Sequence, residues 1–426
     1  MNRKKMLGFK KYYSVEEALK EFKTRIQESK EYEIVNVTDS LNRFSFENVL
    51  SNFDLPAEDR SVVDGYAVRS IDVSGASPSN PIEISIVGKI SAGEKSSIVI
   101  EKDQAIEIYT GGKLPNGSDC VVMAEDCSRN GDKLLVMKQC FKYQNVSRKG
   151  EDFSNGDIVI KKGTLIRPFH IGALVSCGVD KLKVFKKARV SVISTGSELK
   201  NIGDEKDGII DSTRPMIISA LKENYAEPID LGIVKDDLNE IKEKLRIAIQ
   251  ISDLVVITGG TSLGNYDLVP DAVESIAKPG IVVHGIAMRP ARTTGIAFDG
   301  KIPIIMISGF PVAAYISFNL FFREFLKIFY GTVLNPVPEI KGKLTKRFPN
   351  PPGIRSFVRV RIIKKDNDYL IEPLRLTGSG ILSTLTRANG IMVINENSEG
   401  YDENSIVNVE ITQPIEEVNN DAKNIS

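Results

Sequence analysis

Between residues 189 and 331, apolar runs typical of buried strands alternate with stretches that have helical hydrophobic spacing. The strand-like runs are nearly continuous in valine and isoleucine, which is typical of strands that helices cover on both faces. This alternation predicts a doubly wound α/β domain with a parallel sheet. We expect strands at residues 190–195, 228–234, 253–258, 281–288 and 302–307, and helices at residues 215–224, 238–251, 267–277 and 312–330.

The rest of the chain has different patterns. Residues 48–147 consist of short alternating runs separated by Gly, Asn and Ser turns, which predicts a small barrel or sandwich. After a proline-marked link at residues 335–339, further alternating runs predict another β-rich segment. Near the start, Ser14 precedes an amphipathic helix that we expect to reach Glu28, and Glu17 completes a capping box.

One apolar run imitates a membrane span. Residues 302–322 contain no charged side chain and are long enough to cross a bilayer. Turn-forming residues at 308–311 divide this run, so a buried strand, a loop and an apolar helix explain it better. The first residues carry charge but no apolar run, which argues against a secretory signal. We therefore expect a soluble cytoplasmic protein that does not bind membranes.

Composition narrows the choice of function. Lys plus Arg and Asp plus Glu number 56 each, which argues against a nucleic-acid partner bound through a global positive field. The four cysteines form no C-x-x-C pair and there are two histidines, so a zinc site cannot be assembled. No G-x-S-x-G motif supports a Ser-His-Asp triad. A local basic pocket for a small anion remains compatible with these counts.

Three loops follow predicted strands, at the sheet edge where open α/β folds bind their ligands: residues 194–198, 258–267 and 308–311. The second loop has three glycines, two adjacent hydroxyl side chains between them (Thr261 and Ser262) and a following helix N-terminus, which together suit a phosphate. It is neither a Walker A motif nor a G-x-G-x-x-G motif. Its spacing alone supports phosphate binding and a simple tight turn equally.

Carboxylates near these strand ends suit Mg²⁺ held together with substrate phosphates. They are Glu198, Asp236, Asp237 and Asp267. Asp267 also stands where a helix N-cap is expected, which is the commoner role for such a residue. Arg289 and Arg292 offer forked donors for an oxyanion, although a pair of solvated surface arginines is the plainer alternative.

Several motifs resemble those of one family. RSVVDGYAV resembles its signature segment through Asp64, EIYTGGKLPNGSDCVVMAED is similar to its TGA-x-LP-x-GAD-x-VV stretch, and a GED segment ends at Asp152. VSVISTGSEL is similar to a strand ending in STGDEL and carries Glu198. DLVVITGGTSLGNYDLV matches GG-x-S-x-G-x-YD through Asp267, and LTGSGILSTLTRANGIMVI resembles a GS…ANG segment with Ser379. In this order the motifs resemble the MoeA and gephyrin E-domain family of molybdopterin molybdenumtransferases, in an archaeal-like variant.

The resemblance implies a reaction and an assembly. Adenylylated molybdopterin and molybdate (or tungstate) would be the substrates, Mg²⁺ the divalent cation and AMP a product, with the metal left on the dithiolene. A homodimer with its active site between subunits is implied, and the adenylyltransferase of the same pathway is a further expected partner. The domains would be an elongated one in two segments, a β-rich one, a molybdopterin-binding α/β domain and a C-terminal β-barrel, at residues 14–47 with 148–183, 48–147, 184–332 and 335–415.

The resemblance and the strand-end positions together define the expected site residues. Catalytic roles are expected for Asp64, Asp152, Glu198 and Asp267. Metal ligands are expected to be Asp236, Asp237 and Asp267. Substrate-binding residues are expected to be Thr110, Gly259, Gly260, Ser262, Gly264, Arg289, Arg292, Ser308, Gly309 and Ser379.

Three ligand loops depart from the family pattern. The family's KPGKP is replaced by RPART at residues 289–293, its LPGNPV by ISGFPV at residues 307–312, and its DSN by Asp211-Ser212-Thr213. Lys-to-Arg changes keep the charge but alter the donor geometry, so tungstate is an alternative to molybdate. Two other functions stay open: a molybdopterin adenylyltransferase, which shares the α/β domain, and a non-catalytic molybdopterin carrier or scaffold. The Asp64 and GED segments outside that domain speak against the first, and the acidic set favours catalysis over the second.

Overall fold

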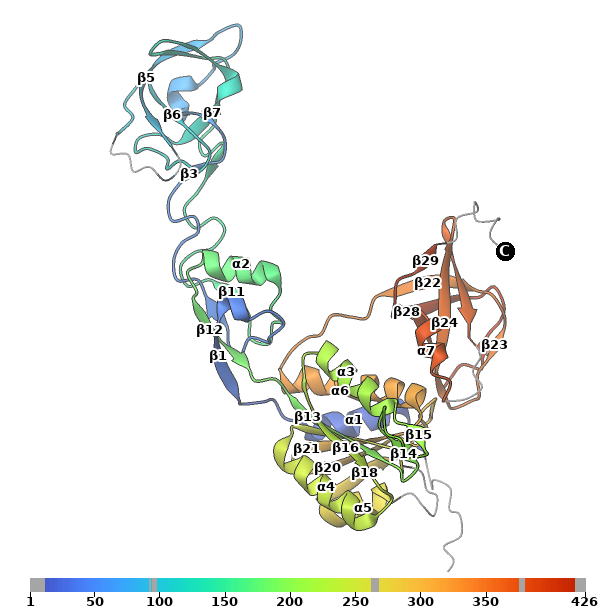
Figure 1. Cartoon of the computed structure of the whole chain (residues 1–426). Coiled ribbons are helices and arrows are strands. Elements are labelled where there is room, and N and C mark those ends of the chain that lie inside the picture. The colour runs from blue at the N-terminus through green and yellow to red at the C-terminus, as the bar shows by residue number, and fades with distance from the viewer. Residues whose placement is uncertain (1–11, 92, 94–97, 262–267, 375–379, 418–426) are drawn as a thin grey trace, which may run out of the picture. The chain divides into compact units, whose positions relative to one another are not determined.

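The computed structural model describes residues 12–91, 93, 98–261, 268–374 and 380–417 of the 426-residue chain (Figure 1). The chain forms two compact units. One contains the N-terminal residues up to Glu31 and everything from Phe185 onward, and the other is Tyr32–Val184.

A six-stranded sheet forms the centre of the first unit, in the order β16-β13-β17-β21-β20-β18. The first four strands of this order run parallel to one another. Strand β20 is antiparallel to β21, and β18 is antiparallel to β20. The strands are β13 (Arg189–Thr195), β16 (Glu227–Val234), β17 (Leu254–Thr258), β18 (Pro279–His284), β20 (Gly295–Asp299) and β21 (Ile302–Ile307).

Helices cover both faces of this sheet (Figure 1). Helices α4 and α5 pack together on one face, where their apolar side chains share a core with β17 and β21. Helices α3 and α6 pack together on the other, and α1 lies against α6. The helices are α1 (Val15–Arg25), α3 (Thr213–Glu223), α4 (Leu238–Ile251), α5 (Val269–Ile276) and α6 (Pro311–Phe329). The predicted doubly wound α/β domain is confirmed.

The antiparallel edge corrects the expectation of a wholly parallel sheet. Strand β20 was not predicted, and residues Gly300 and Lys301 alone separate it from β21. A two-residue connection reverses the chain and can join only antiparallel neighbours. The predicted strand at 281–288 is also divided, because β18 ends at His284 and β19 (Met288–Arg289) pairs with another sheet.

Two local predictions are confirmed closely. Helix α1 begins after Ser14, whose Oγ accepts the Glu17 amide (3.1 Å), while the Ser14 amide donates to the Glu17 carboxylate (2.8 Å). The helix is shorter than expected, because it ends at Arg25. The apolar run at 302–322 forms β21 and the first part of α6, most of which is buried. Among the described residues there is no helix long and apolar enough to cross a membrane.

The C-terminal part of the first unit is a closed β-barrel, as predicted. Strand β24 (Arg355–Lys365) pairs with β25 (Asp368–Pro373) and β26 (Gly390–Ile394), and the order β25-β22-β28-β26 completes the ring. The remaining two strands are β22 (Glu339–Leu344) and β28 (Ile406–Ile411). Val358, Val360 and Ile362 point into the barrel core, so the side chains between them on β24 face outward.

The second unit has a six-stranded sheet in the order β7-β4-β6-β5-β9-β8. Its strands are β4 (Gly65–Val68), β5 (Ile82–Ile90), β6 (Gln104–Ile108), β7 (Cys120–Met123), β8 (Cys127–Asn130) and β9 (Lys133–Val136). Chain segments before and after this sheet pair with one another, β1 (Tyr32–Asn36) with β12 (Lys181–Phe185) and β2 (Val49–Leu50) with β11 (Ile158–Ile160). Such pairing is what a domain in two segments needs. The bounds of the four predicted domains stay a prediction. Helix α1 belongs to the predicted segment 14–47, but it packs on α6 of the first unit.

Candidate functional site

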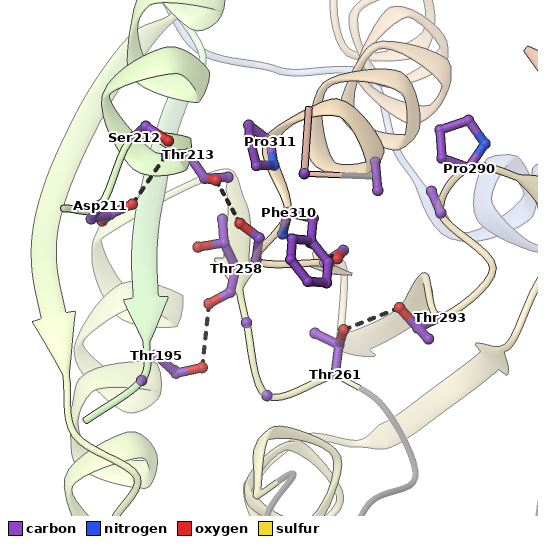
Figure 2. A pocket seen from close by; sticks show the side chains of 18 of the residues that line it. Thr195, Asp211, Ser212, Thr213, Thr258, Thr261, Pro290, Thr293, Phe310 and Pro311 are labelled. Carbon is purple, nitrogen blue, oxygen red and sulfur yellow. Dashed lines mark hydrogen bonds between the residues drawn. The ribbon is translucent and has the colours of Figure 1, made fainter. Parts of the chain in front are cut away.

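A cavity of about 1050 Å³ opens at the edge of the sheet where the parallel strands β13, β17 and β21 end beside one another. All three loops that follow these strands contribute to its lining (Figure 2). The carboxyl ends of parallel strands share one edge, which is why loops distant in sequence meet there. The expected site residues that line the cavity are Glu198, Asp236, Gly259, Gly260, Arg289, Arg292, Ser308 and Gly309.

The glycine turn after β17 is tightly packed. Gly259 has a φ of +86° and Gly260 a φ of +55°, both in the left-handed region. A Cβ at Gly259 would lie 2.3 Å from the carbonyl oxygen of Thr195, and one at Gly260 would lie 3.0 Å from the Thr195 Oγ1. The Gly259 amide donates to the carbonyl oxygen of Ile307 (3.0 Å). Gly259 therefore has a structural reason to be glycine, and its amide is already bonded within the protein.

A matched pair of substitutions tests whether Gly259 is required for packing in this turn. Gly259→Ala should lower the free energy of unfolding by about 2–3 kcal/mol, since it combines a left-handed residue with a clash against backbone. Gly309→Ala should cost less than about 1 kcal/mol, because its added Cβ would meet nothing closer than the Gly259 Cα at 3.5 Å. Urea denaturation of both variants measures the difference. Equal stability would contradict the packing role of Gly259.

Two helices begin at the cavity and turn their positive ends toward it. Helix α6 starts at Pro311 and α3 starts at Thr213, and both residues line the cavity. The Thr213 hydroxyl donates to the Gly309 carbonyl oxygen (2.7 Å), which joins the two helix starts (Figure 2). The helix dipole makes such ends favourable for anions, but at α3 the amides of Thr213 and Arg214 are already bonded to the Asp211 carboxylate, so the α6 end is the one open to a ligand.

The segment Asp211-Ser212-Thr213, which departs from the family pattern, is firmly held. Asp211 Oδ1 accepts the amides of Thr213 and Arg214 (3.1 Å each), and its Oδ2 accepts from the Arg214 guanidinium (3.1 Å). Arg214 also pairs with Asp230 on β16. Asp211 and Arg214 are both buried. The threonine in place of the family's asparagine thus has a specific role, which is to hold Gly309.

Three of the four expected carboxylates near the strand ends are described, and they differ in environment. Asp236 Oδ2 accepts the Ser197 amide (2.8 Å), and the Ser197 hydroxyl accepts the Asp236 amide (3.0 Å), which ties the loops after β13 and β16 together. The Glu198 carboxylate lies over Gly196, whose added Cβ would come within 2.8 Å of it. Asp237 instead caps α4, since its Oδ1 accepts the Asn239 and Glu240 amides (2.9 Å each). Glu198 and Asp236 line the cavity.

The number of these carboxylates suits a magnesium ion that is bound jointly by the protein and by the substrate's phosphates. No group of three or more His, Cys, Asp or Glu side chains that could hold a metal occurs among the described residues. Mg²⁺ in phosphate-handling sites is commonly held by one or two carboxylates together with the substrate's phosphates. Glu198 and Asp236 supply that number at the cavity wall, so the donor set is compatible with Mg²⁺ that arrives with a phosphorylated substrate.

Arg289 and Arg292 also line the cavity and are exposed. Between them, Ala291 has a φ of +80°, at the position where the family pattern has glycine. The Arg292 guanidinium lies 5.4 Å from the centre of the Tyr12 ring, a cation–π contact that restrains it. Both predicted arginines are therefore placed where an anion in the cavity would meet them.

Arg359 is a cavity residue that the sequence did not reveal. It lies on the outer face of β24 but is 3% exposed, because the barrel rests against the α/β layer there. Its Nη1 donates to the Phe357 carbonyl oxygen (3.1 Å), while its buried Nε has no hydrogen-bond partner among the described residues. Burial, followed by the charge of Arg289, lowers the pKa of Arg359. In sequence it alternates with Val358 and Val360 and therefore looks like a solvated barrel residue.

In the second unit, Asp64 stands directly before β4 and is well oriented. Its Oδ1 accepts hydrogen bonds from the Thr110 amide (2.7 Å) and hydroxyl (2.8 Å). These two bonds lower the pKa of Asp64 below its ordinary value, so it is a carboxylate at neutral pH. Thr110, expected to bind substrate, therefore orients Asp64. Asp152 is exposed, and its amide donates to the Leu55 carbonyl oxygen (3.0 Å).

The remaining expected site residues lie outside the described part of the chain. They are Ser262, Gly264, Asp267 and Ser379. The N-cap of α5 is Leu268, which makes no side-chain cap hydrogen bond.

Comparison with known proteins matches nearly the whole chain. The family model of the "MoeA N-terminal region (domain I and II)" matches residues 13–178. That of a "probable molybdopterin binding domain" matches residues 191–328, and that of the "MoeA C-terminal region (domain IV)" matches residues 341–412.

Individual relatives cover similar lengths. A putative molybdopterin biosynthesis protein of Methanocaldococcus jannaschii is 35% identical over 90% of this chain and 93% of its own. The molybdopterin molybdenumtransferase of Staphylococcus aureus is 33% identical over 88% of this chain and 90% of its own. The crystal structure of a molybdopterin biosynthesis MoeA protein from Pyrococcus horikoshii superposes with a TM-score of 0.83 at 31% identity, covering 94% of this chain and all of that one.

Proposed function

Because the chain belongs to the MoeA family, we propose that it is a transferase of molybdenum cofactor biosynthesis that inserts molybdate, or tungstate, into adenylylated molybdopterin and releases AMP. The observation that carries this proposal is the buried, incompletely bonded guanidinium of Arg359 at the cavity wall. A buried charge without a partner is costly, and an oxyanion in the cavity would remove that cost.

The other cavity groups support the same substrates. The N-terminus of α6 and the guanidinium groups of Arg289, Arg292 and Arg359 offer positive charge to phosphate and oxometallate oxygens. Fixed positive groups of this kind stabilise the charge that develops on those oxygens as the bond to AMP breaks. Gly260, which lines the cavity without a side chain, would let a phosphate come close to the main chain.

Mg²⁺ is proposed as the divalent cation of this reaction. When bound, it would neutralise phosphate oxygens and orient the leaving group. Glu198 and Asp236 are the described residues that would hold it, and Asp267 would join them. Asp237 is less suited, since its carboxylate caps α4.

We further propose that the working form is a homodimer in which Asp64, Thr110 and Asp152 act on the partner's cavity. The lowered pKa of Asp64 keeps it charged for this role. The second unit also exposes apolar side chains that suit a protein contact, among them Tyr32 and Ile34, which share one face of β1. The adenylyltransferase of the same pathway is proposed as a transient partner that delivers the substrate.

Two alternatives make different predictions. An adenylyltransferase would form the bond to AMP and would need no residue from the barrel, whereas Arg359 and Leu382 of the barrel line this cavity. A carrier or scaffold would bind molybdopterin without turnover. Purified protein supplied with adenylylated molybdopterin, Mg²⁺ and molybdate or tungstate should release AMP in step with metal insertion. Binding without AMP release with either metal would favour the carrier.

Mixing two inactive mutants tests the dimer. Neither Asp64→Ala nor Asp267→Ala homodimers should turn over if each active site uses both residues. In a mixed dimer, one site carries both defects and the other is intact. Random equal mixing gives roughly half mixed dimers, so about a quarter of the sites should regain AMP release. Background activity, with subunit exchange verified by mass spectrometry, would place both residues in a site built from one chain.

A further inference from the structure

An aromatic ring stands in the cavity at a position where the family pattern has asparagine. Phe310 lines the cavity between β21 and α6, and its side chain is exposed, at 58%. In Figure 2 the ring stands in the middle of the view, between Thr213 on one side and Thr293 on the other. A single exposed apolar residue is ordinary on a protein surface. An exposed ring inside a substrate cavity, at a departure from the family pattern, calls for a specific explanation.

The surroundings of the ring leave it open on the cavity side. On the barrel side it is met by Gly380, where an added Cβ would lie 3.1 Å from the ring's Cδ1 and 3.4 Å from its Cε1. Glycine thus gives the ring room in this position. Pro290, Pro311 and Leu382 contribute further apolar surface to the same cavity. A flat ligand with apolar faces would find matching surface here.

The ring is also held on a rigid support. The Phe310 amide donates to the Ser308 Oγ (3.2 Å), and its carbonyl oxygen accepts the Ala314 amide (2.9 Å) in the first turn of α6. Phe310 is the N-cap of that helix, with extended backbone at φ −74° and ψ 124°, and Pro311 follows at the first helical position. With the backbone fixed in this way, only the side-chain torsions of the ring remain to be ordered when a ligand binds.

We propose that Phe310 is the stacking face for a planar nitrogen heterocycle of the substrate, either the pterin or the adenine. The inference rests on the proposed function, which supplies a substrate that contains both rings. Polar edges of such a ring would meet hydroxyl groups on either side, those of Thr213 and Thr258 on one side and that of Thr293 on the other. Aromatic stacking is tolerant of which heterocycle it holds, so the two rings must be separated by experiment.

The test compares four full-length proteins: wild type, Phe310→Ala, Phe310→Leu and Phe310→Tyr. Calorimetry with AMP alone and with non-adenylylated molybdopterin alone measures the dissociation constant for each ring. Loss of stacking should raise the affected constant about 5- to 100-fold in Phe310→Ala. The dissociation constant of Phe310→Tyr should stay within about threefold of the wild-type value. That of Phe310→Leu should be close to that of Phe310→Ala, because leucine keeps apolar volume without a flat π face.

Kinetics supply a second readout. With adenylylated molybdopterin, Phe310→Ala should raise KM by a similar factor and leave kcat unchanged at saturation, since the ring would bind the ground state and the transition state equally. Ile202→Ala is the matched control, because Ile202 is an exposed apolar side chain outside the cavity lining. It should alter neither KM nor the dissociation constants.

The outcomes separate the inference from the function on which it rests. An effect confined to AMP assigns adenine to Phe310, and an effect confined to molybdopterin assigns the pterin. If the wild type binds and turns over, and Phe310→Ala binds both ligands as tightly as the wild type does, the stacking role is overturned and the function stands. A fall in melting temperature without any change in binding makes the ring structural and also overturns it. Failure of the wild type to bind either ligand rejects the proposed function itself.

Discussion

Arg359→Met should make the ligand-free protein more stable and, at the same time, raise the molybdate or tungstate concentration needed for half-maximal AMP release about 100-fold. The first effect follows from burial. Methionine fills a similar volume without a charge, and replacing an incompletely paired buried ion by an apolar side chain stabilises proteins by about 1–4 kcal/mol. The residue is 3% exposed, and its Nε lacks a partner among the described residues.

The second effect follows from the loss of a preorganised positive group at the cavity. Removing one such group costs about 3 kcal/mol in other enzymes, which corresponds to the 100-fold estimate. The opposite signs distinguish a functional residue from a packing residue, because removal of a packing residue lowers stability and leaves the response to metal unchanged.

Arg361→Met is the control on the same strand. Arg361 lies on the same outer face of β24 as Arg359, but it is partly exposed and pairs with Glu372 and Glu416. Its replacement should leave AMP release unchanged and should not raise the melting temperature. Calorimetric melting and AMP release against metal concentration measure both quantities. A destabilised Arg359→Met with an unchanged metal response would refute the anion role.

Asp236→Asn should lower turnover about 100-fold, whereas Asp237→Asn should turn over like the wild type. Asparagine at 236 keeps an acceptor for the Ser197 amide but loses the charge proposed to help hold Mg²⁺. Asparagine at 237 still caps α4, since Asn and Asp are about equally good N-caps. The two neighbours therefore form a matched pair, with the same change in net charge and different expected effects.

AMP release as a function of Mg²⁺ concentration measures this difference. Asp236→Asn should need more Mg²⁺ for half-maximal rate, and denaturation should show the fold intact in both variants. Equal losses in the two variants would indicate a general electrostatic effect of the acidic pair. A loss in Asp237→Asn alone would move the metal-binding role to Asp237.

The hydrophobic pattern predicted the layers and most elements of the α/β unit. Helix α4 has the predicted bounds, Leu238–Ile251, because its amphipathic spacing and its Asp237 cap act within a few residues. The apolar run at 302–322 was divided correctly, since Gly309 and Pro311 interrupt it locally. The antiparallel edge was missed, because β20 has the sequence GIAFD, with a single β-branched residue, and so lacks the Val/Ile run of the other strands.

The positions of the cavity loops also followed from the sequence. A strand's carboxyl end can be located from its apolar run, and parallel strands bring their ends to one edge, so the loops at 194–198, 258–261 and 308–311 had to meet. The same reasoning could not rank the acidic residues there. Asp236 and Asp237 are neighbours in sequence, and the start of α4 decides which one becomes a cap and which one lines the cavity.

What depends on contacts between distant segments was decided by the tertiary structure alone. Arg359 has the pattern of an outward barrel residue, and it becomes a buried cavity residue only because the barrel rests on the loop that contains Arg289. The exposure of Phe310 and the space that Gly380 leaves for it arise at the same junction. The sequence alone determined elements and strand ends, because hydrophobic periodicity and caps act over a few residues. Burial of a charge depends on which surfaces meet, and no local pattern encodes that.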